Sequence, residues 1–317
     1  MAERRHEYAP AGTLPGMLQR GRGLGALMAA EDPASAAELV YGCIRWEWRW
    51  DSNTDERHLY LARLVRDLEL PLGPVVEVLA GGEEACERAA GVLALLALSG
   101  SVEAREALRA YIREGEHRSD VLESVADAWP REWWGDLEEA AWDRDRDRDR
   151  GSGRREPSGP VREAERPDPM AEAASGALPG RSAEHGEERD VPALVAELER
   201  DWVDRTWCGP MQLARGLARF GPGAAGAVSL LRRFWLYTPH SHERAAYLEA
   251  LAAAGSAGMP EAYTESLWDC EADVRLLGVE HAPDTPHVRA RLAYLRDDPI
   301  ELPEVSNAAE ERLAGLS

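Results

Sequence analysis

A 31-residue spacing is the sequence feature that most constrains how this chain folds. The tetrad Glu-Arg-Ala-Ala occurs at residues 87–90 and again at residues 243–246. Steps of 31 residues through these tetrads connect two series of positions, Arg57, Arg88 and Ser119, and Arg244, Arg275 and Ser306. Self-similarity at a period of about 20–50 residues marks supersecondary units that stack on their neighbours. The spacing therefore predicts an array of repeated units.

Helix caps and helix breakers indicate that these units are helical. Asp32 followed by Pro33 is typical of an N-cap with proline at the first helical position, and Thr54 is a candidate cap for the helix that Pro71 ends. Short gaps between helices favour antiparallel pairs, so we expect an all-α fold. The expected helices span 34–44, 59–68, 74–79, 83–98, 102–113, 120–129 and 131–142, and then 191–203, 210–219, 222–236, 241–254, 260–268, 271–281, 286–296 and 303–314.

Residues 143–190 interrupt this pattern. The stretch begins with four Asp-Arg pairs and continues with Gly, Pro, Ser, Glu and Arg. Such a composition buries too little apolar surface to offset the entropy of ordering, so it predicts a disordered charged linker. A short charged helix and a condensate-forming tract are the alternatives. The expected organisation is a flexible N-terminal segment (1–30), an N-terminal helical-repeat module (31–142), the linker, and a C-terminal helical-repeat module (191–317).

The second helices of the C-terminal pairs begin with related sequences, His-Glu-Arg-Ala-Ala, Asp-Val-Arg-Leu-Leu and Glu-Val-Ser-Asn-Ala. These openings resemble the HEAT-repeat or armadillo-like family, whose units place a Val-Arg pair early in the second helix. Val274 and Arg275 match best, Arg244 and Arg88 each follow a glutamate, and Ser306 lacks the arginine. The resemblance implies an α-solenoid of antiparallel helix pairs, used in two modules. It specifies the fold far more than the function.

The four repeat arginines, Arg57, Arg88, Arg244 and Arg275, are therefore interpreted as stacking residues. An arginine at the same place in every unit is suited to bind carbonyl oxygens of the preceding unit or a neighbouring carboxylate. We expect this structural role to prevail over ligand binding.

The segment 45–51, Arg-Trp-Glu-Trp-Arg-Trp-Asp, is the most unusual in the chain. Spacing by two residues places three tryptophans on one side of an extended segment and the charged residues on the other. Trp and Arg are favoured at the centres of protein interfaces. The candidate partner-binding residues are Trp46, Trp48, Arg49, Trp50 and Asp51. The alternative is a loop that covers the end of the N-terminal helices.

Charge and composition exclude several functions. The net charge is −21 and lysine is absent, as in proteins of high-GC bacterial genomes. A negative field opposes nucleic-acid binding and favours basic or zwitterionic partners. The longest apolar stretch, 92–98, is too short to span a membrane, and we expect the cytosol as the location and no membrane insertion.

We expect no metal, cofactor or catalytic site. The four cysteines form no Cys-X-X-Cys pair, and His240 with His242, like His281 with His287, lacks a well-spaced third ligand. Nucleophile-elbow, phosphate-loop and zinc-protease motifs are absent from the sequence.

The expected function is a non-catalytic scaffold or adaptor for a protein partner. The alternatives are an enzyme on a HEAT-like fold, resembling a tetrapyrrole lyase or a DNA glycosylase, and a purely structural subunit of a larger assembly. A glycosylase-like site needs an aromatic cleft with a carboxylate, for which Trp46 or Trp48 with Asp51 or Asp55 are the candidates.

Overall fold

The computed structural model describes residues 7–138, here called the N-terminal part, and residues 187–316, called the C-terminal part. Both are built from helices, and neither contains a strand. This confirms the predicted all-α class within the described residues. The predicted linker lies outside them up to residue 186, and its end at Glu188–Asp190 is a short 3-10 helix that runs into the next helix.

From Pro33 to Ala126 the helices of the N-terminal part follow the predicted boundaries closely, but the helix predicted over 131–142 is wrong as far as residue 138, where two short 3-10 turns stand in its place. Asp32 caps the third helix as expected, accepting a hydrogen bond from the Ser35 amide at 3.2 Å. Thr54 caps nothing, because the next helix begins only at His58. The elements are α1 (Leu14–Gln19), α2 (Gly23–Glu31), α3 (Pro33–Arg45), α4 (His58–Asp67), α5 (Gly73–Val78), α6 (Glu83–Leu98), α7 (Val102–Glu114), α8 (Arg118–Ala126), η1 (Arg131–Trp133) and η2 (Gly135–Leu137).

The C-terminal part also matches the prediction, apart from two helices that start with a 3-10 segment. Its elements are η3 (Glu188–Asp190), α12 (Val191–Asp204), α13 (Pro210–Ala218), η4 (Gly221–Ala227), α14 (Val228–Tyr237), η5 (Ser241–Glu243), α15 (Arg244–Ala253), α16 (Met259–Ser266), α17 (Ala272–His281), α18 (Pro286–Asp297) and α19 (Pro303–Gly315). Helices that are close in the chain pack on one another. Both α13 and α14 contact α15, α15 contacts α17, and both α17 and α18 contact α19. Within the described residues, no helix combines the length and the apolar character that crossing a bilayer requires.

The predicted flexible segment 1–30 is wrong from residue 14 onward, where α1 and α2 lie. Two glycines of this segment are sites of close packing. A Cβ atom on Gly23 would lie 1.9 Å from the carbonyl oxygen of Glu265, and one on Gly21 would lie 2.5 Å from Sγ of Cys270. Gly21 also has a φ of +64°, which glycine adopts readily. These residues let α2 approach the turns around α16.

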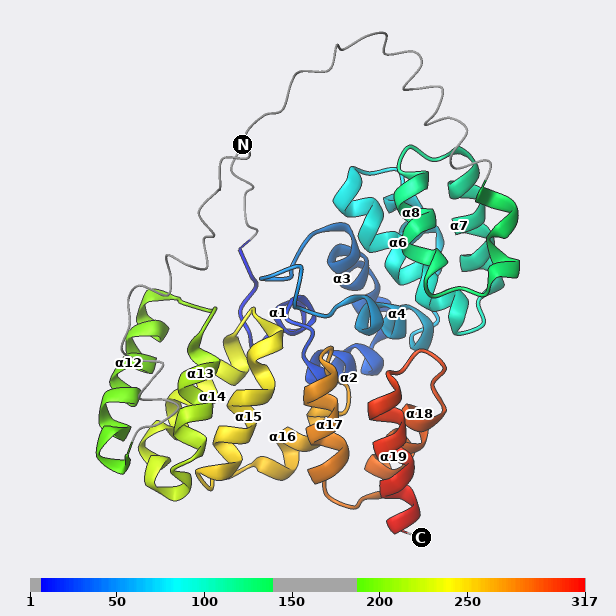
Figure 1. Ribbon diagram of the computed structural model, residues 1–317. Coiled ribbons are helices and arrows are strands. Elements are labelled where there is room, and N and C mark those ends of the chain that lie inside the picture. Colours follow the sequence, from blue (N-terminus) through cyan, green and yellow to red (C-terminus); the bar gives the residue numbers. More distant parts are fainter. Residues whose placement is uncertain (1–6, 139–186, 317) are drawn as a thin grey trace, which may run out of the picture.

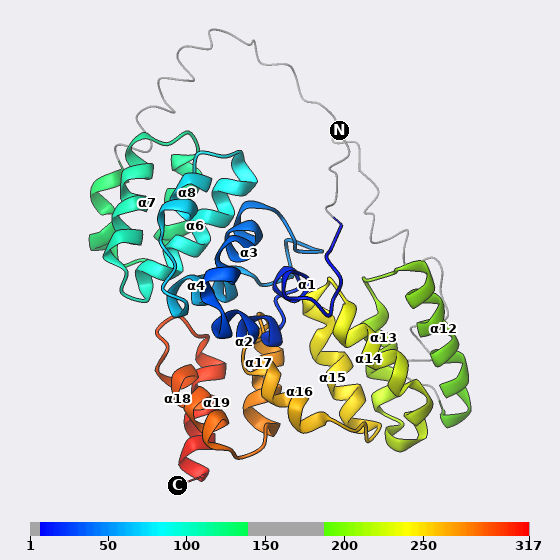
Figure 2. The same cartoon turned by 180° about the vertical axis from the view of Figure 1, so that it is seen from behind.

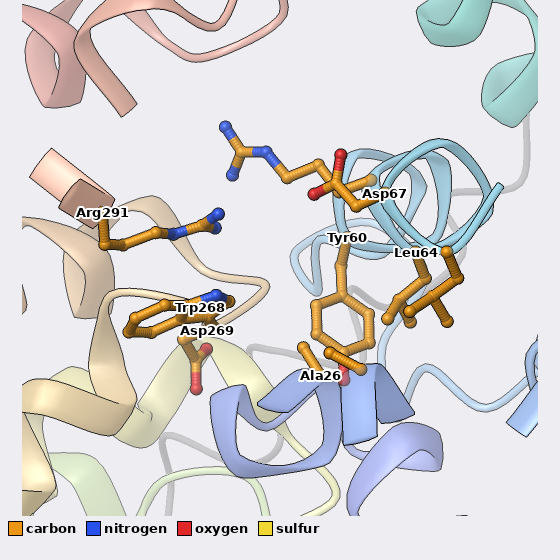
Figure 3. Close-up of a pocket in the computed structure, with 10 residues that line it drawn as sticks. Ala26, Tyr60, Leu64, Asp67, Trp268, Asp269 and Arg291 are labelled. Carbon is orange, nitrogen blue, oxygen red and sulfur yellow. The ribbon is translucent and has the colours of Figure 1, made fainter. Parts of the chain in front are cut away.

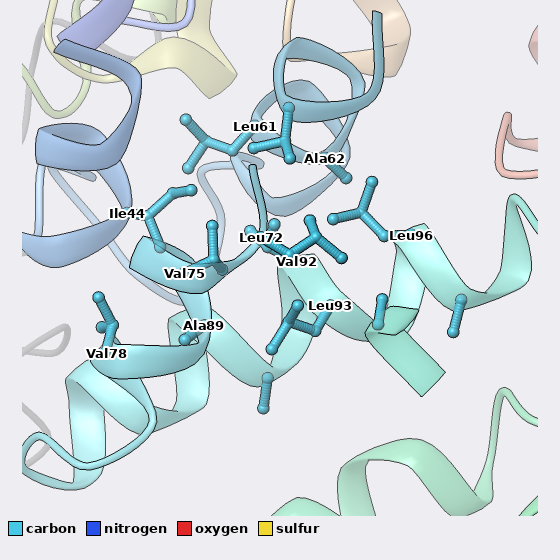
Figure 4. Packing of buried hydrophobic residues seen from close by; sticks show 14 of the residues in the cluster. Ile44, Leu61, Ala62, Leu72, Val75, Val78, Ala89, Val92, Leu93 and Leu96 are labelled. Carbon is cyan, nitrogen blue, oxygen red and sulfur yellow. The ribbon is translucent and has the colours of Figure 1, made fainter. Parts of the chain in front are cut away.

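A hydrophobic core fills the N-terminal part, where α3, α4, α5 and α6 meet (Figure 4). Ile44, Val75, Val92 and Leu93 are fully buried there. Cys270 of the C-terminal part belongs to the same core. Two further cores lie within the C-terminal part, one among α12–α16 and one among α16–α19.

The two parts are not separate bodies on a tether. In both overall views α1, α2 and α4 lie between the C-terminal part and the group α6–α8 (Figures 1 and 2). Buried polar contacts cross the boundary. Arg22 forms a bidentate ion pair with Glu265, its shortest distance being 2.7 Å, and the Cys270 amide donates to the Gly21 carbonyl at 3.0 Å. The described residues therefore share one continuous set of contacts.

Candidate functional site

The connection between α3 and α4, residues 46–57, lies at the boundary between the two parts. It is non-helical, as its two-residue alternation predicted. Its tryptophans do not share one environment, however. Trp48 packs on the N-terminal core with its ring 5.5 Å from the ring of Tyr8, whereas Trp50 packs on the core of α12–α16. The connection thus places one tryptophan on each part. The three tryptophans therefore do not form the single aromatic face that the alternation predicted.

Trp46 differs from both. Its side chain is 49% exposed, and it is the only tryptophan in the described residues that is classed as exposed. It lies directly after α3, where its amide donates to the Gly42 carbonyl and closes the last helical turn. Among the predicted partner-binding residues, it is the one that presents a large aromatic surface to solvent.

Arg49 and Asp51 are engaged within the connection itself. The Arg49 guanidinium pairs with Glu47 at 2.7 Å and its side chain is only 7% exposed. Burial opposes the charge of Glu47, but the hydrogen bonds and charge of Arg49 outweigh it, and the pKa of Glu47 falls below its ordinary value. Asp51 accepts from the Asn53 amide at 2.9 Å. These two residues shape the connection rather than face a partner.

Asp55 joins the connection to the turn before α15. Its carboxylate accepts from Ser241 Oγ at 3.1 Å and from the His242 amide at 3.1 Å, and lies 2.7 Å from Nδ1 of His240. Burial opposes ionisation, but the His240 hydrogen bond and the Arg57 charge prevail and hold the pKa of Asp55 well below its usual range. Both oxygens of the buried carboxylate are thus engaged in hydrogen bonds at the boundary between the two parts.

Arg57 follows Asp55 into the same junction. Its guanidinium donates to Ser241 Oγ at 2.7 Å and to Cys270 Sγ at 2.8 Å, and lies 3.8 Å from Glu271. All three contacts reach residues of the C-terminal part. Arg57 therefore joins the two parts, where we expected it to stack within the N-terminal array.

The other arginine series has an internal regularity in the C-terminal part. Arg244, Arg275 and Ser306 are each the fourth residue counted from the start of a helical segment. Arg244 pairs with Asp269, and Arg275 pairs with Glu301 at 2.8 Å. In each case the carboxylate lies beyond the next helix of the chain: Asp269 follows α16 and Glu301 follows α18. Arg275 also donates to the carbonyls of Asp269 and Cys270, which lie in the turn just before its own helix and not in the preceding helix pair.

Arg88 makes a different set of contacts. It donates to the carbonyls of Ile44 and Arg45 at 3.2 and 3.0 Å, both in the preceding unit. Moreover, Arg57 precedes α4, Arg88 is the sixth residue of α6 and Ser119 is the second of α8. The 31-residue step thus reaches equivalent helical positions in the C-terminal part but not in the N-terminal part.

One cluster was missed by the sequence analysis. Cys208, in the turn between α12 and α13, lies beside His240 and Glu243, and one candidate ligand atom from each lies within 4.8 Å of the others. His240 was set aside because no third ligand stood near it in the sequence. The third ligand is separated from it by more than thirty residues, and only the packing of α13 against α15 brings the two turns together.

A small pocket of about 80 Å³ opens between α2, α4 and α18 (Figure 3). The Arg291 guanidinium there lies 4.7 Å from the ring centre of Trp268 and 4.1 Å from that of Tyr294. Burial, together with the nearby Arg63 charge, lowers the pKa of Arg291 to about 10. Ligand sites usually measure about 300–1,000 Å³, so this pocket is too small for a typical ligand and is a feature of the boundary between the two parts.

Comparisons with known proteins add no assignment. Neither family models, nor curated proteins, nor solved structures yielded a match to this chain.

Proposed function

We propose that this chain is a non-catalytic scaffold, a HEAT-like helical array that holds a protein partner at the surface around Trp46. The observation that carries the proposal is the exposed ring of Trp46, since the other described tryptophans are at least largely covered. Tryptophan is enriched among the few residues that supply most of the binding energy of an interface. The cytosol is the expected location.

The surroundings of Trp46 suit a protein interface. Arg45, the residue before it in the chain, is exposed, as are residues 52–54 later in the same connection, and interfaces commonly surround an apolar anchor with a polar rim. The partly buried rings of Trp48 and Trp50, which follow Trp46 in the chain, hold the connection on its two cores. A rigid support lowers the entropic cost of binding.

The charge of the chain indicates the chemistry of the partner. With a net charge of −21, the chain attracts basic segments and repels nucleic acid. We therefore propose a partner that presents a basic, solvent-exposed segment.

Site-specific photo-crosslinking tests this function. A crosslinking amino acid at position 46, introduced in the native host, should capture one protein in stoichiometric yield, whereas the same group at position 203 should not. Val203 is a suitable control because it is 70% exposed on α12. Binding of that purified partner should then weaken at least about 30-fold in Trp46→Ala, as for an interface hot spot. Equal crosslinking from both positions, or unchanged affinity in the variant, would contradict the proposal.

A further inference from the structure

Three metal-binding side chains of different types converge at the turns that precede α13 and α15. The candidate ligand atoms of Cys208, His240 and Glu243 all lie within 4.8 Å of one another. Tetrahedral zinc, with ligands at about 2.0–2.3 Å, places its ligand atoms about 3.3–3.6 Å apart. The ligand atoms must therefore move closer together when zinc binds.

The histidine is held in the manner of a metal ligand. Nδ1 of His240 lies 2.7 Å from a carboxylate oxygen of Asp55, and Asp55 is itself fixed by Ser241 and by the His242 amide. A carboxylate on one ring nitrogen orients the imidazole and leaves the other nitrogen, Nε2, as the electron-pair donor. Asp55 comes from the N-terminal part, so the arrangement exists only when the two parts are packed together.

The glutamate is tied to the loop that carries the cysteine. Glu243 accepts from the amides of Gly209 at 2.6 Å and of Met211 at 3.1 Å, and also from the Tyr247 hydroxyl. Gly209 has a φ of +112°, which only glycine adopts without strain. The sharp turn directly after Cys208, together with the hydrogen bonds from the Gly209 and Met211 amides, keeps the thiol beside the Glu243 carboxylate.

The charges around these side chains favour a cation. The carboxylate of Glu243 lies beside Cys208 and that of Asp55 lies beside His240, so two carboxylates contribute negative charge at the cluster. Thiolate, imidazole and carboxylate together are a ligand set that suits zinc, whereas magnesium and calcium prefer oxygen alone. Cys208 is exposed, so an ion here is reachable from solvent.

We propose that Cys208, His240 and Glu243 bind one zinc ion, with Asp55 as the positioning residue of His240 and a fourth coordination position open to solvent. The site is independent of the partner surface proposed above. Three protein ligands and one open position distinguish it from closed structural zinc sites, which use four.

Cobalt titration of the chelator-treated, reduced full-length chain tests the proposal, because Co²⁺ reports both geometry and thiolate ligation in its absorption. We expect one equivalent to bind with visible d–d bands and a thiolate-to-cobalt charge-transfer band, and zinc to displace it. Cys208→Ser should lose the charge-transfer band and bind at least about 100-fold more weakly. Asp55→Asn should keep the band and weaken binding about 10–100-fold.

The control is His281→Ala, an exposed histidine on α17, which should behave as the unmodified chain. Because Cys208 is exposed, Cys208→Ser should retain its circular-dichroism spectrum and melting temperature in the absence of metal. The proposal is overturned if the unmodified chain shows no charge-transfer band at stoichiometric cobalt, or if Cys208→Ser binds with the same affinity and spectrum.

Discussion

Arg63 in α4 donates at 2.8 Å to the carboxylate of Glu301, a residue 238 positions further along the chain. The same carboxylate accepts from Arg275 of the C-terminal part, and both oxygens are buried. Arg63 also pairs with Asp298 at 2.8 Å. A buried charge is tolerated only when it is paired and hydrogen-bonded. This network therefore depends on both parts of the chain being in place.

Replacing Arg63 should be costly for that reason. We expect Arg63→Leu to lower the free energy of unfolding by about 3–5 kcal/mol, because it leaves buried carboxylates short of a cation. Urea unfolding followed by circular dichroism measures the change. Arg289→Leu is the control, since its pair with Asp284 is exposed and exposed pairs contribute little to stability. Equal losses of unfolding free energy in the two variants would show that the buried pairs of Arg63 stabilise the fold no more than an exposed pair does.

The two parts should also stay together after the chain is cut between them. With a protease site inserted after residue 165, cleavage should yield fragments that co-elute in size-exclusion chromatography, because buried pairs such as Arg22 with Glu265 join them. The cut Arg63→Glu variant should dissociate more readily, since it sets a third carboxylate against Asp298 and Glu301. Separate elution of the unmodified fragments would show that the parts are independent modules, as first expected.

Two glycines should respond in opposite directions to alanine. In Gly23→Ala the new Cβ would lie 1.9 Å from a backbone oxygen of Glu265, so α2 must move, and we expect a loss of about 1–3 kcal/mol. In Gly42→Ala, inside α3, no atom lies within 4 Å of the new Cβ, and helix propensity should add about 0.5–1 kcal/mol. Melting temperatures that shift in the same direction for both variants would contradict this packing.

Glu271 should make stability depend on pH near neutrality. Burial raises the pKa of this carboxyl to about 7, although the charge of Arg57 acts in the opposite direction. The folded state thus holds the proton more tightly than the unfolded state does, and stability falls as the pH rises from about 4.5 through 7. Glu271→Gln removes this contribution. Between pH 5 and pH 8, the unmodified chain should lose about 2 kcal/mol of unfolding free energy relative to the variant, measured by urea titration. Parallel curves would show that Glu271 does not titrate in this range.

The sequence predicted helices well where caps and breakers act locally. Asp32 with Pro33 marks the start of α3, and α6 spans the predicted 83–98 without change. The prediction of a flexible segment over residues 1–30 failed at α1 and α2, where Gly21 and Gly23 permit a close approach that the local sequence does not reveal. That approach depends on Glu265 and Cys270, more than 240 residues away.

The candidate sites show the same limit. The alternation of residue types predicted the extended character of residues 46–50. A two-residue alternation specifies only which side chains lie on the same side of the segment. It does not reveal that Trp48 packs on the core of the N-terminal part and Trp50 on a core of the C-terminal part. Likewise, His240 looked incomplete as a ligand because Cys208 belongs to another helix pair and Asp55 to the other part. Contacts of this kind arise only from the assembled fold.

Arg244 and Arg275 each pair with a carboxylate that lies beyond the next helix of the chain, so the two pairs run in the same direction. One 31-residue step before Arg244 stands Leu213, and one step after Arg275 stands Ser306, so the series of guanidinium groups stops at both ends. The buried positive charge on each of these two helices is therefore neutralised by a segment that is made after it in the chain.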